Sequence, residues 1–64
     1  MSAKIRLCDG REITIALGAK RVAEALRQGQ EENSMFVQFK TATETKIWIN
    51  PANVAAIEDR PDLD

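Results

Sequence analysis

Apolar residues alternate with polar ones in several short stretches of this chain, which is the two-residue period of a β-strand. The clearest stretch lies immediately before Pro51, where Ile47 and Ile49 point to one face and their neighbours to the other. Pro51 ends this strand, because proline has no amide hydrogen and holds the preceding residue extended. Val54 and Ile57 follow as a second apolar pair, on a short fifth strand or on one helical turn.

Residues 3–17 are predicted to form a β-hairpin, because apolar side chains alternate on both of its strands. The Asp-Gly pair at its centre suggests a two-residue turn. That register would place the two apolar sets on opposite faces of the sheet, which is costly when one face is buried. A three-residue loop, Cys8-Asp9-Gly10, instead sets Ile5 opposite Ile13. Gly10 then takes the left-handed position of a type I turn with a bulge, and we predict this loop.

A helix is predicted over residues 19–28, because apolar side chains recur at helical spacing in one narrow stripe: Ala19, Val22, Ala23 and Leu26. Gly29 suits the left-handed residue just past the end of such a helix. The start is weakly marked, since Gly18 stands where Ser or Asp would cap better. A helix of about ten residues does not persist alone, so we expect it to dock on the sheet.

Residues 35–40 and 46–50 are predicted to pair as a second hairpin. The expected core-facing side chains of this hairpin are Met35, Val37, Phe39, Ile47 and Ile49. The opposite face carries the aromatic residues and several polar ones, namely Phe36, Gln38, Lys40, Lys46 and Trp48.

The composition argues against most catalytic chemistry. The chain has no histidine, which is the commonest general acid–base and metal ligand at neutral pH. The single cysteine, Cys8, has no disulfide partner and no histidine to activate it, and we expect a small, semi-buried side chain. No phosphate-binding loop or dinucleotide fingerprint occurs. We therefore expect a non-enzymatic protein with no catalytic residue, no cofactor and no metal site.

The short chain limits the size of the core. A domain of this length buries only about 60% of the surface that its unfolded chain exposes. We therefore expect it to be marginally stable alone, or to complete its core by self-association. Phe36 and Trp48 are expected to be buried, either within the monomer or where subunits meet, and the alternative is an exposed platform for a ligand. The first functional hypothesis is a protein-interaction or oligomerisation module that uses the Phe36/Trp48 face or an open sheet edge.

Lys40, Lys46 and Trp48 support a second hypothesis, a small protein that binds single-stranded nucleic acid. In such proteins bases stack on aromatic side chains while lysines follow the phosphates. The net charge of −1 provides no overall attraction to nucleic acid. The partner is therefore expected to be a second copy or another protein, with nucleic acid as the alternative.

Two resemblances to known families concern separate parts of the chain. Residues 47–58, Ile-Trp-Ile-Asn-Pro-Ala-Asn-Val-Ala-Ala-Ile-Glu, resemble a strand–turn–strand segment of many short bacterial and phage proteins of unknown function, and the start of small flagellar proteins of the FlbD type. In the flagellar proteins a similar segment precedes a strand–glycine–strand–helix unit like residues 5–26 here, so the order is reversed. The opening hairpin and helix resemble the start of ubiquitin-like β-grasp domains. The chain lacks their C-terminal Gly-Gly, and neither resemblance supplies functional residues.

These elements together predict a single α+β domain over residues 1–58, in the order β-β-α-β-β with a possible short fifth strand. One helix is expected to pack through Val22, Ala23 and Leu26 on a small antiparallel sheet, which is either β-grasp-like or a small barrel. Residues 59–64 are expected to be an acidic, frayed tail. No apolar run is long enough to span a bilayer and no signal-peptide core occurs, so we expect a cytoplasmic protein without membrane contact.

Overall fold

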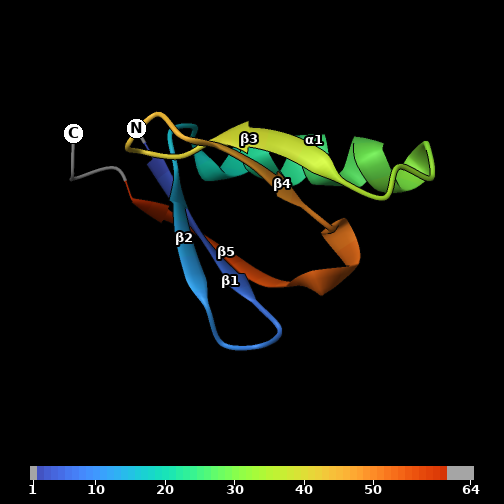
Figure 1. The fold of residues 1–64 in the computed structure, drawn as a ribbon, viewed down its shortest axis with the longest axis horizontal. Coiled ribbons are helices and arrows are strands. Elements are labelled where there is room, and N and C mark those ends of the chain that lie inside the picture. Colours follow the sequence, from blue (N-terminus) through green and yellow to red (C-terminus); the bar gives the residue numbers. More distant parts are fainter. Residues whose placement is uncertain (1, 61–64) are drawn as a thin grey trace.

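The computed structural model describes residues 2–60, which form five strands and one helix (Figure 1). The elements follow the order β1 (Ser2–Leu7), β2 (Glu12–Ile15), α1 (Ala19–Glu31), β3 (Val37–Lys40), β4 (Lys46–Ile49), the short 3-10 helix η1 (Pro51–Asn53) and β5 (Val54–Arg60). One sheet has the strand order β2-β1-β5 and the other pairs β3 with β4. All of these pairings are antiparallel. The predicted α+β class, its single helix and its possible fifth strand are confirmed, whereas the strands divide between two sheets where one was predicted.

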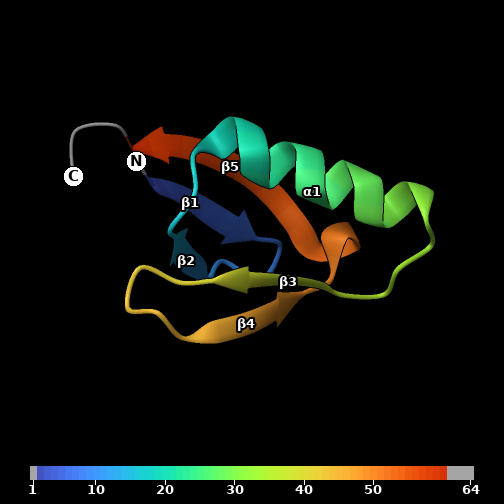
Figure 2. The ribbon, with the colours of Figure 1, turned by 90° about the horizontal axis from the view of Figure 1, so that it is seen from above.

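The two sheets meet at one corner, where Ile15 of β2 forms a bridge with Thr41, the residue directly after β3. The Ala16 N–H donates to the Lys40 carbonyl at 3.0 Å on one side of this bridge. From this corner the β3–β4 hairpin turns away from β2, so the sheets stay open and no closed barrel forms within residues 2–60. Figure 2 shows the consequence, because β4 lies at one outer side of the molecule while β5 and α1 lie at the other.

The first hairpin has the predicted three-residue loop. Ile5 lies opposite Ile13, and the Leu7 N–H donates to the Arg11 carbonyl at 2.8 Å. The Gly10 N–H donates to the Leu7 carbonyl at 3.0 Å, and Gly10 has a φ of 95°. This is the left-handed position that glycine occupies without steric cost, so the bulge closes the loop with both apolar sets on one face.

The helix is three residues longer than predicted, and Gly29 does not end it. Gly29 is buried inside α1, whereas the left-handed residue is Asn33, with a φ of 58°. The Asn33 N–H donates to Gln30, and the Ser34 N–H donates to the Gly29 carbonyl at 2.8 Å. These two bonds form a Schellman motif, in which asparagine replaces the usual glycine.

The buried stripe of α1 also differs from the predicted one. Val22 and Leu26 are buried as expected, but Ala23 is exposed and Gly29 takes its place in the interface. The partly buried Ala25 completes the stripe. The helix is therefore rotated slightly relative to the predicted stripe, with its smallest residue where it approaches the sheet most closely.

Residues 59 and 60, which were predicted to belong to a frayed tail, extend β5. Arg60 lies opposite Ser2, and Asp59 lies opposite Ala3 in the pairing with β1. An Asp59 carboxylate oxygen also accepts a hydrogen bond from the Ala19 N–H at 3.3 Å. Asp59 thus supplies the N-terminal acceptor for α1 that Gly18 lacks, from a strand forty residues later. The rest of the predicted tail lies outside the described residues.

The core lies between α1 and the inner faces of the two sheets. Its buried side chains are Ala3, Ile5, Leu7, Ile15, Val22, Leu26, Phe39 and Ile49. Met35 was expected in this set but is 72% exposed, because β3 begins only at Val37 and the preceding residues lie outside the ladder. In the described part of the chain, no helix has the length and apolar character that crossing a membrane requires.

Candidate functional site

The outer face of the β3–β4 hairpin carries the sequence-predicted site residues. Phe39 and Ile49 point into the core, so the alternate residues of each strand point outward. Trp48 lies directly opposite Gln38, and Lys46 lies directly opposite Lys40. We call the set Phe36, Gln38, Lys40, Lys46 and Trp48 the aromatic–lysine face.

Both aromatic residues of this face are exposed to solvent. Phe36 is 55% exposed and Trp48 is 59% exposed. The sequence favoured burial of these two side chains within the monomer or where subunits meet; burial within the monomer is therefore wrong, and burial between subunits stays a prediction. No segment of residues 2–60 covers them, because Pro51–Asn53 turns the chain away from β4 and β5 returns along β1. Exposed aromatic side chains that lie close together are typical of surfaces that bind another molecule.

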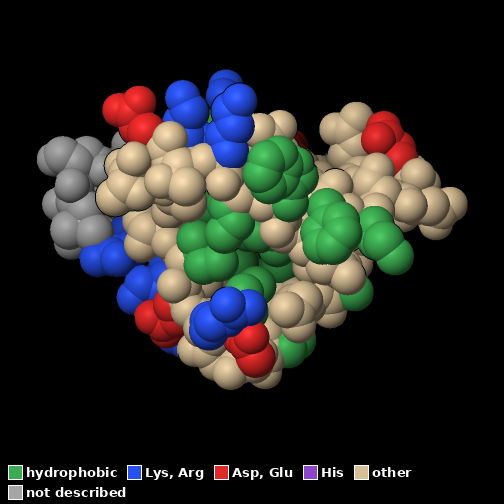
Figure 3. All heavy atoms as spheres, viewed as in Figure 1, with side chains coloured by type: hydrophobic (Ala, Val, Ile, Leu, Met, Phe, Trp, Pro, Cys, Tyr) green, Lys and Arg blue, Asp and Glu red, His purple; other side chains and the backbone are tan. Residues whose placement is uncertain are grey.

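A hollow of about 230 Å³ opens beside the aromatic pair and reaches the core. We call it the front hollow, and its lining residues are Leu7, Arg11, Ile13, Phe36, Ile47, Trp48, Ile49, Asn50 and Asn53. Figure 3 shows hydrophobic side chains at the bottom of a depression in the centre of this view, with further hydrophobic side chains standing out on one side. The volume is below the roughly 300–1,000 Å³ of small-molecule sites, so side chains of a larger partner are the better match.

Sequence reasoning missed the front hollow, because it depends on how far the β3–β4 hairpin turns from β2. Ile13 and Ile47 were both expected to be core residues, and each is only partly buried. The gap between them lies where the two open sheets diverge. No local pattern in the sequence encodes this angle.

The free edge of β4 borders the same hollow. The Thr41 N–H donates to the Thr45 carbonyl at 2.8 Å. Hydrogen-bonded and non-hydrogen-bonded residue pairs alternate along an antiparallel ladder. Ile47 and Ile49 of β4 are therefore hydrogen-bonded to β3, whereas the backbone N–H and C=O groups of Lys46 and Trp48 point to the other edge. No backbone group elsewhere in residues 2–60 is hydrogen-bonded to these two residues. The backbone donors and acceptors of Lys46 and Trp48 on this edge are therefore open to a partner.

The two lysines of the aromatic–lysine face lie directly opposite each other. Neither forms an ion pair with a carboxylate of the described residues. Like charges directly opposite on neighbouring strands are destabilising. Both lysines also border a second depression of about 400 Å³, which lies between β3 and residues 16–17. The face therefore combines apolar surface with two positive charges that no carboxylate of residues 2–60 pairs with.

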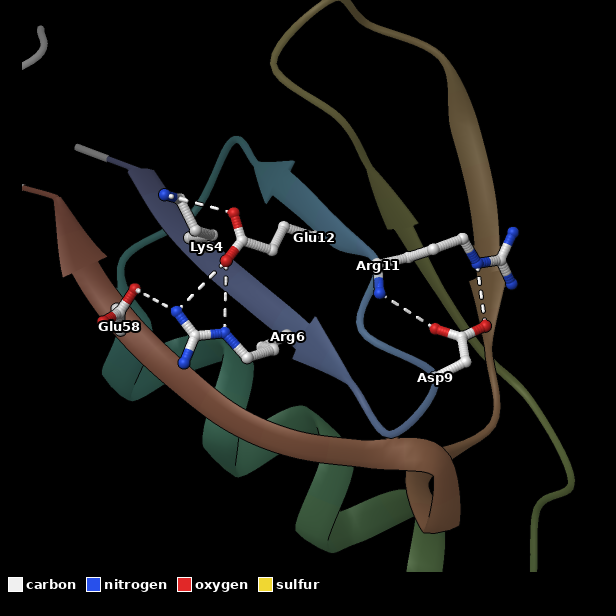
Figure 4. A network of polar contacts seen from close by, with 6 residues as sticks. All are labelled: Lys4, Arg6, Asp9, Arg11, Glu12 and Glu58. Atoms are coloured by element: carbon white, nitrogen blue, oxygen red, sulfur yellow. Dashed lines mark hydrogen bonds and ion pairs between the residues drawn. The ribbon is translucent and has the colours of Figure 1, made fainter.

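The outer face of the other sheet contrasts with this arrangement, because its charges are paired (Figure 4). The Glu12 carboxylate lies 3.5 Å from Lys4 Nζ and 3.1 Å from an Arg6 nitrogen. Arg6 also lies 3.9 Å from Glu58 on β5. Each cation of this cluster has a carboxylate beside it, whereas Lys40 has another cation opposite. The ion cluster therefore offers less to an anionic partner than the aromatic–lysine face.

The carboxylates with perturbed titration are stabilised as anions. The hydrogen bond from the Arg11 N–H lowers the pKa of Asp9, and the hydrogen bond from the Arg6 side chain lowers the pKa of Glu12. A general acid at neutral pH needs a raised pKa, so these two groups are unsuited to that role. Among residues 2–60, no three His, Cys, Asp or Glu side chains converge as a metal site would require.

Cys8 is exposed at the tip of the first hairpin, so the expected semi-buried side chain is wrong. The reason is local: the Cys8 N–H donates to the Asn53 carbonyl at 2.8 Å, and the residue starts the loop rather than continuing the inward-facing set of β1.

Comparison of the sequence with protein-family models and with curated proteins finds no match. The resemblances to FlbD-type proteins and to β-grasp domains stay predictions.

Proposed function

We propose that this protein is a small, non-enzymatic interaction module that binds a protein chain through the aromatic–lysine face and the adjoining edge of β4. The observation that carries the proposal is the exposure of Phe36 and Trp48 beside a hollow that opens into the core. Aromatic residues at the centre of an interface commonly provide a large share of its binding energy. A partner chain that covers this face completes the burial of a thin core.

The energy available from this face supports a binding role. The exposed halves of a phenylalanine and a tryptophan side chain amount to roughly 100 Å² each. At about 25 cal/mol per Å², covering both contributes about 5 kcal/mol. Association costs at least about 4 kcal/mol in lost translational and rotational freedom, so the aromatic pair alone gives weak binding. The front hollow and the edge of β4 supply the additional contacts.

A second candidate function is the binding of single-stranded nucleic acid, and the uncompensated Lys40–Lys46 pair beside Trp48 favours it. Two lysines could follow phosphates while the indole stacks on a base. The candidate differs from protein binding in its salt dependence, because each neutralised phosphate releases counterions. On the other sheet Lys4 and Arg6 are paired with Glu12, so they would add little to the positive charge available to phosphates. The binding surface for nucleic acid would therefore be short.

Photocrosslinking tests the proposal directly. Phe36 is replaced by p-benzoylphenylalanine, and Glu24 on the exposed side of α1 is replaced in the same way as the matched control. Each variant is irradiated as purified protein and in a lysate of the producing cells. We expect protein adducts from position 36 and none above background from position 24. Nucleic-acid adducts from position 36 would favour the second candidate, and equal or absent adducts at both positions would contradict the proposal.

A further inference from the structure

We propose that the partner binds as an extended segment that adds a strand to the free edge of β4. In this arrangement alternate side chains of the segment enter the front hollow, and the others present carboxylates to Lys46 and Lys40. This inference rests on the proposed function and specifies its partner: a peptide segment in which apolar and acidic residues alternate.

The backbone of β4 provides the first argument. Lys46 and Trp48 turn their N–H and C=O groups away from β3, toward an edge that no other described segment covers. Four consecutive residues, 47–50, line the front hollow, although successive side chains of a strand point to opposite faces. The hollow therefore runs along the edge of β4 and not only beneath its inner face. An incoming strand would form hydrogen bonds of the kind that an exposed sheet edge offers.

The front hollow provides the second argument. Across from β4 it is lined by Leu7 and Ile13 of the first hairpin, and on the β4 side by Ile47 and Ile49. A strand beside β4 would turn every second side chain to the same face as Ile47, which is the face of the hollow. Arg11, Asn50 and Asn53 also line the hollow, so its walls are mixed. The apolar part, formed by Leu7, Ile13, Ile47 and Ile49, favours apolar side chains at the positions of the partner that lie against it.

The charges provide the third argument. The remaining side chains of the added strand would stand on the outer face, beside Lys46 and Trp48. Lys46 already faces Lys40 across the hairpin, and neither has a carboxylate partner in the described residues. A carboxylate next to Lys46 would relieve this repulsion, whereas a lysine would increase it. The outer face therefore selects acidic residues.

Other occupants fit these three features less well. A nucleic acid has no side chains to alternate between an apolar hollow and a lysine-bearing face. A second copy that paired β4 with β4 would bring its own Lys46 and no carboxylate on that strand. An extended segment with alternating apolar and acidic residues matches the edge, the hollow and the lysines together.

Amide hydrogen exchange, followed by NMR, tests the inference. The probes are blocked heptapeptides in which Val, Leu or Phe alternates with Glu, and matched peptides in which Lys replaces Glu. With a saturating acidic peptide, we expect the Lys46 and Trp48 amides to exchange at least about tenfold more slowly than without it. The Ile47 amide, which is already hydrogen-bonded to β3, should change little. In an added strand only every second N–H group of the peptide points toward β4. Methylating the amide nitrogens of that set should abolish binding, whereas methylating the other set should preserve it.

A charge exchange provides the second arm of the test. The double variant Lys40→Glu/Lys46→Glu should prefer the lysine peptides, reversing the selectivity of the natural protein by about tenfold or more in Kd, equivalent to about 1.4 kcal/mol. Failure of every acidic peptide to bind, or binding without protection of the Lys46 and Trp48 amides, would overturn the inference. If the Lys46 and Trp48 amides became protected without peptide as the protein concentration increased, the inference would be overturned in favour of a second copy.

Failure of this inference is distinguishable from failure of the proposed function. Protein adducts from position 36 without protection of the β4 edge amides would retain the interaction module and remove strand addition. The absence of both adducts and protection would remove both proposals.

Discussion

Gly29 of α1 and Val37 of β3 approach so closely that only glycine fits the helix position. A Cβ atom built on Gly29 would lie 2.5 Å from Val37 Cγ2 and 3.7 Å from Pro51 Cγ. The glycine therefore sets the distance between the helix and the β3–β4 hairpin. Because the position of the hairpin determines the front hollow, this contact also helps to place the candidate site.

Gly29→Ala is expected to destabilise the domain, although alanine is the better helix former. The helix propensity gain is about 1 kcal/mol, and overpacking of a closely packed contact costs about 1–3 kcal/mol. Val37 is β-branched and has few alternative rotamers, so it does not move aside easily. Urea denaturation should show a net loss of up to about 2 kcal/mol. In a Val37→Ala background the same change should become neutral or stabilising, and additive effects of the two substitutions would contradict this account.

Lys46→Glu is expected to stabilise the fold while it removes binding to an acidic segment. The change replaces a like-charge pair with an opposite-charge pair on facing strands, where such pairs differ by about 0.2–1 kcal/mol. Lys46→Gln, which only removes the repulsion, should fall between the two. Thermal unfolding at low and high salt checks this order, because screening should reduce the differences. A Lys46→Glu protein less stable than the natural one would show that the lysine has a structural role.

The elements of this fold could be predicted where one local pattern determined them. The strand pairing of the first hairpin followed from keeping Ile5 and Ile13 on one face, and the structure has that register. Gly29 was misinterpreted because glycine suits two different environments, a left-handed cap and a close contact, and the sequence alone does not separate them. Asn33 ends the helix instead, through backbone hydrogen bonds that no side-chain pattern predicts.

The candidate site was predicted in composition but not in shape. Alternation placed Phe36 and Trp48 on one face with the lysines, yet the sequence favoured their burial, within the monomer or between subunits, because so short a chain has a thin core. Their exposure depends on where β5 runs, and β5 pairs with β1 instead of covering β4. The length of β5 was also underestimated, since Glu58 and Asp59 are poor strand formers and are held there by pairing with β1.

Glu12→Gln is expected to reduce the dependence of stability on acidic pH. The Arg6 hydrogen bond lowers the pKa of Glu12 below the value of about 4.3 in an unfolded chain. The ionised carboxylate therefore contributes stability above that value, and this contribution is lost as the pH falls through the folded-state pKa. The variant should have a lower Tm at pH 7 and a smaller difference between its Tm values at pH 7 and pH 3.

The matched control for this prediction is Glu24→Gln, which makes the same charge change on an exposed helix residue outside the ion cluster. Its Tm should follow the pH profile of the natural protein more closely than that of Glu12→Gln. Parallel profiles for the natural protein and Glu12→Gln would show that the hydrogen bond with Arg6 contributes nothing in solution.

Trp48→Ala and Phe39→Ala are expected to differ strongly in their effect on the stability of the monomer. Trp48 is 59% exposed, so its truncation should change the free energy of unfolding of the monomer by less than about 1 kcal/mol. Phe39 is 4% exposed, and its truncation should cost about 3–5 kcal/mol, a large part of the stability of a small domain. Urea denaturation at several protein concentrations, with light scattering, measures both effects. A loss of several kcal/mol for Trp48→Ala that grows with protein concentration would show that a second copy covers the indole, because only association makes stability depend on concentration in this way.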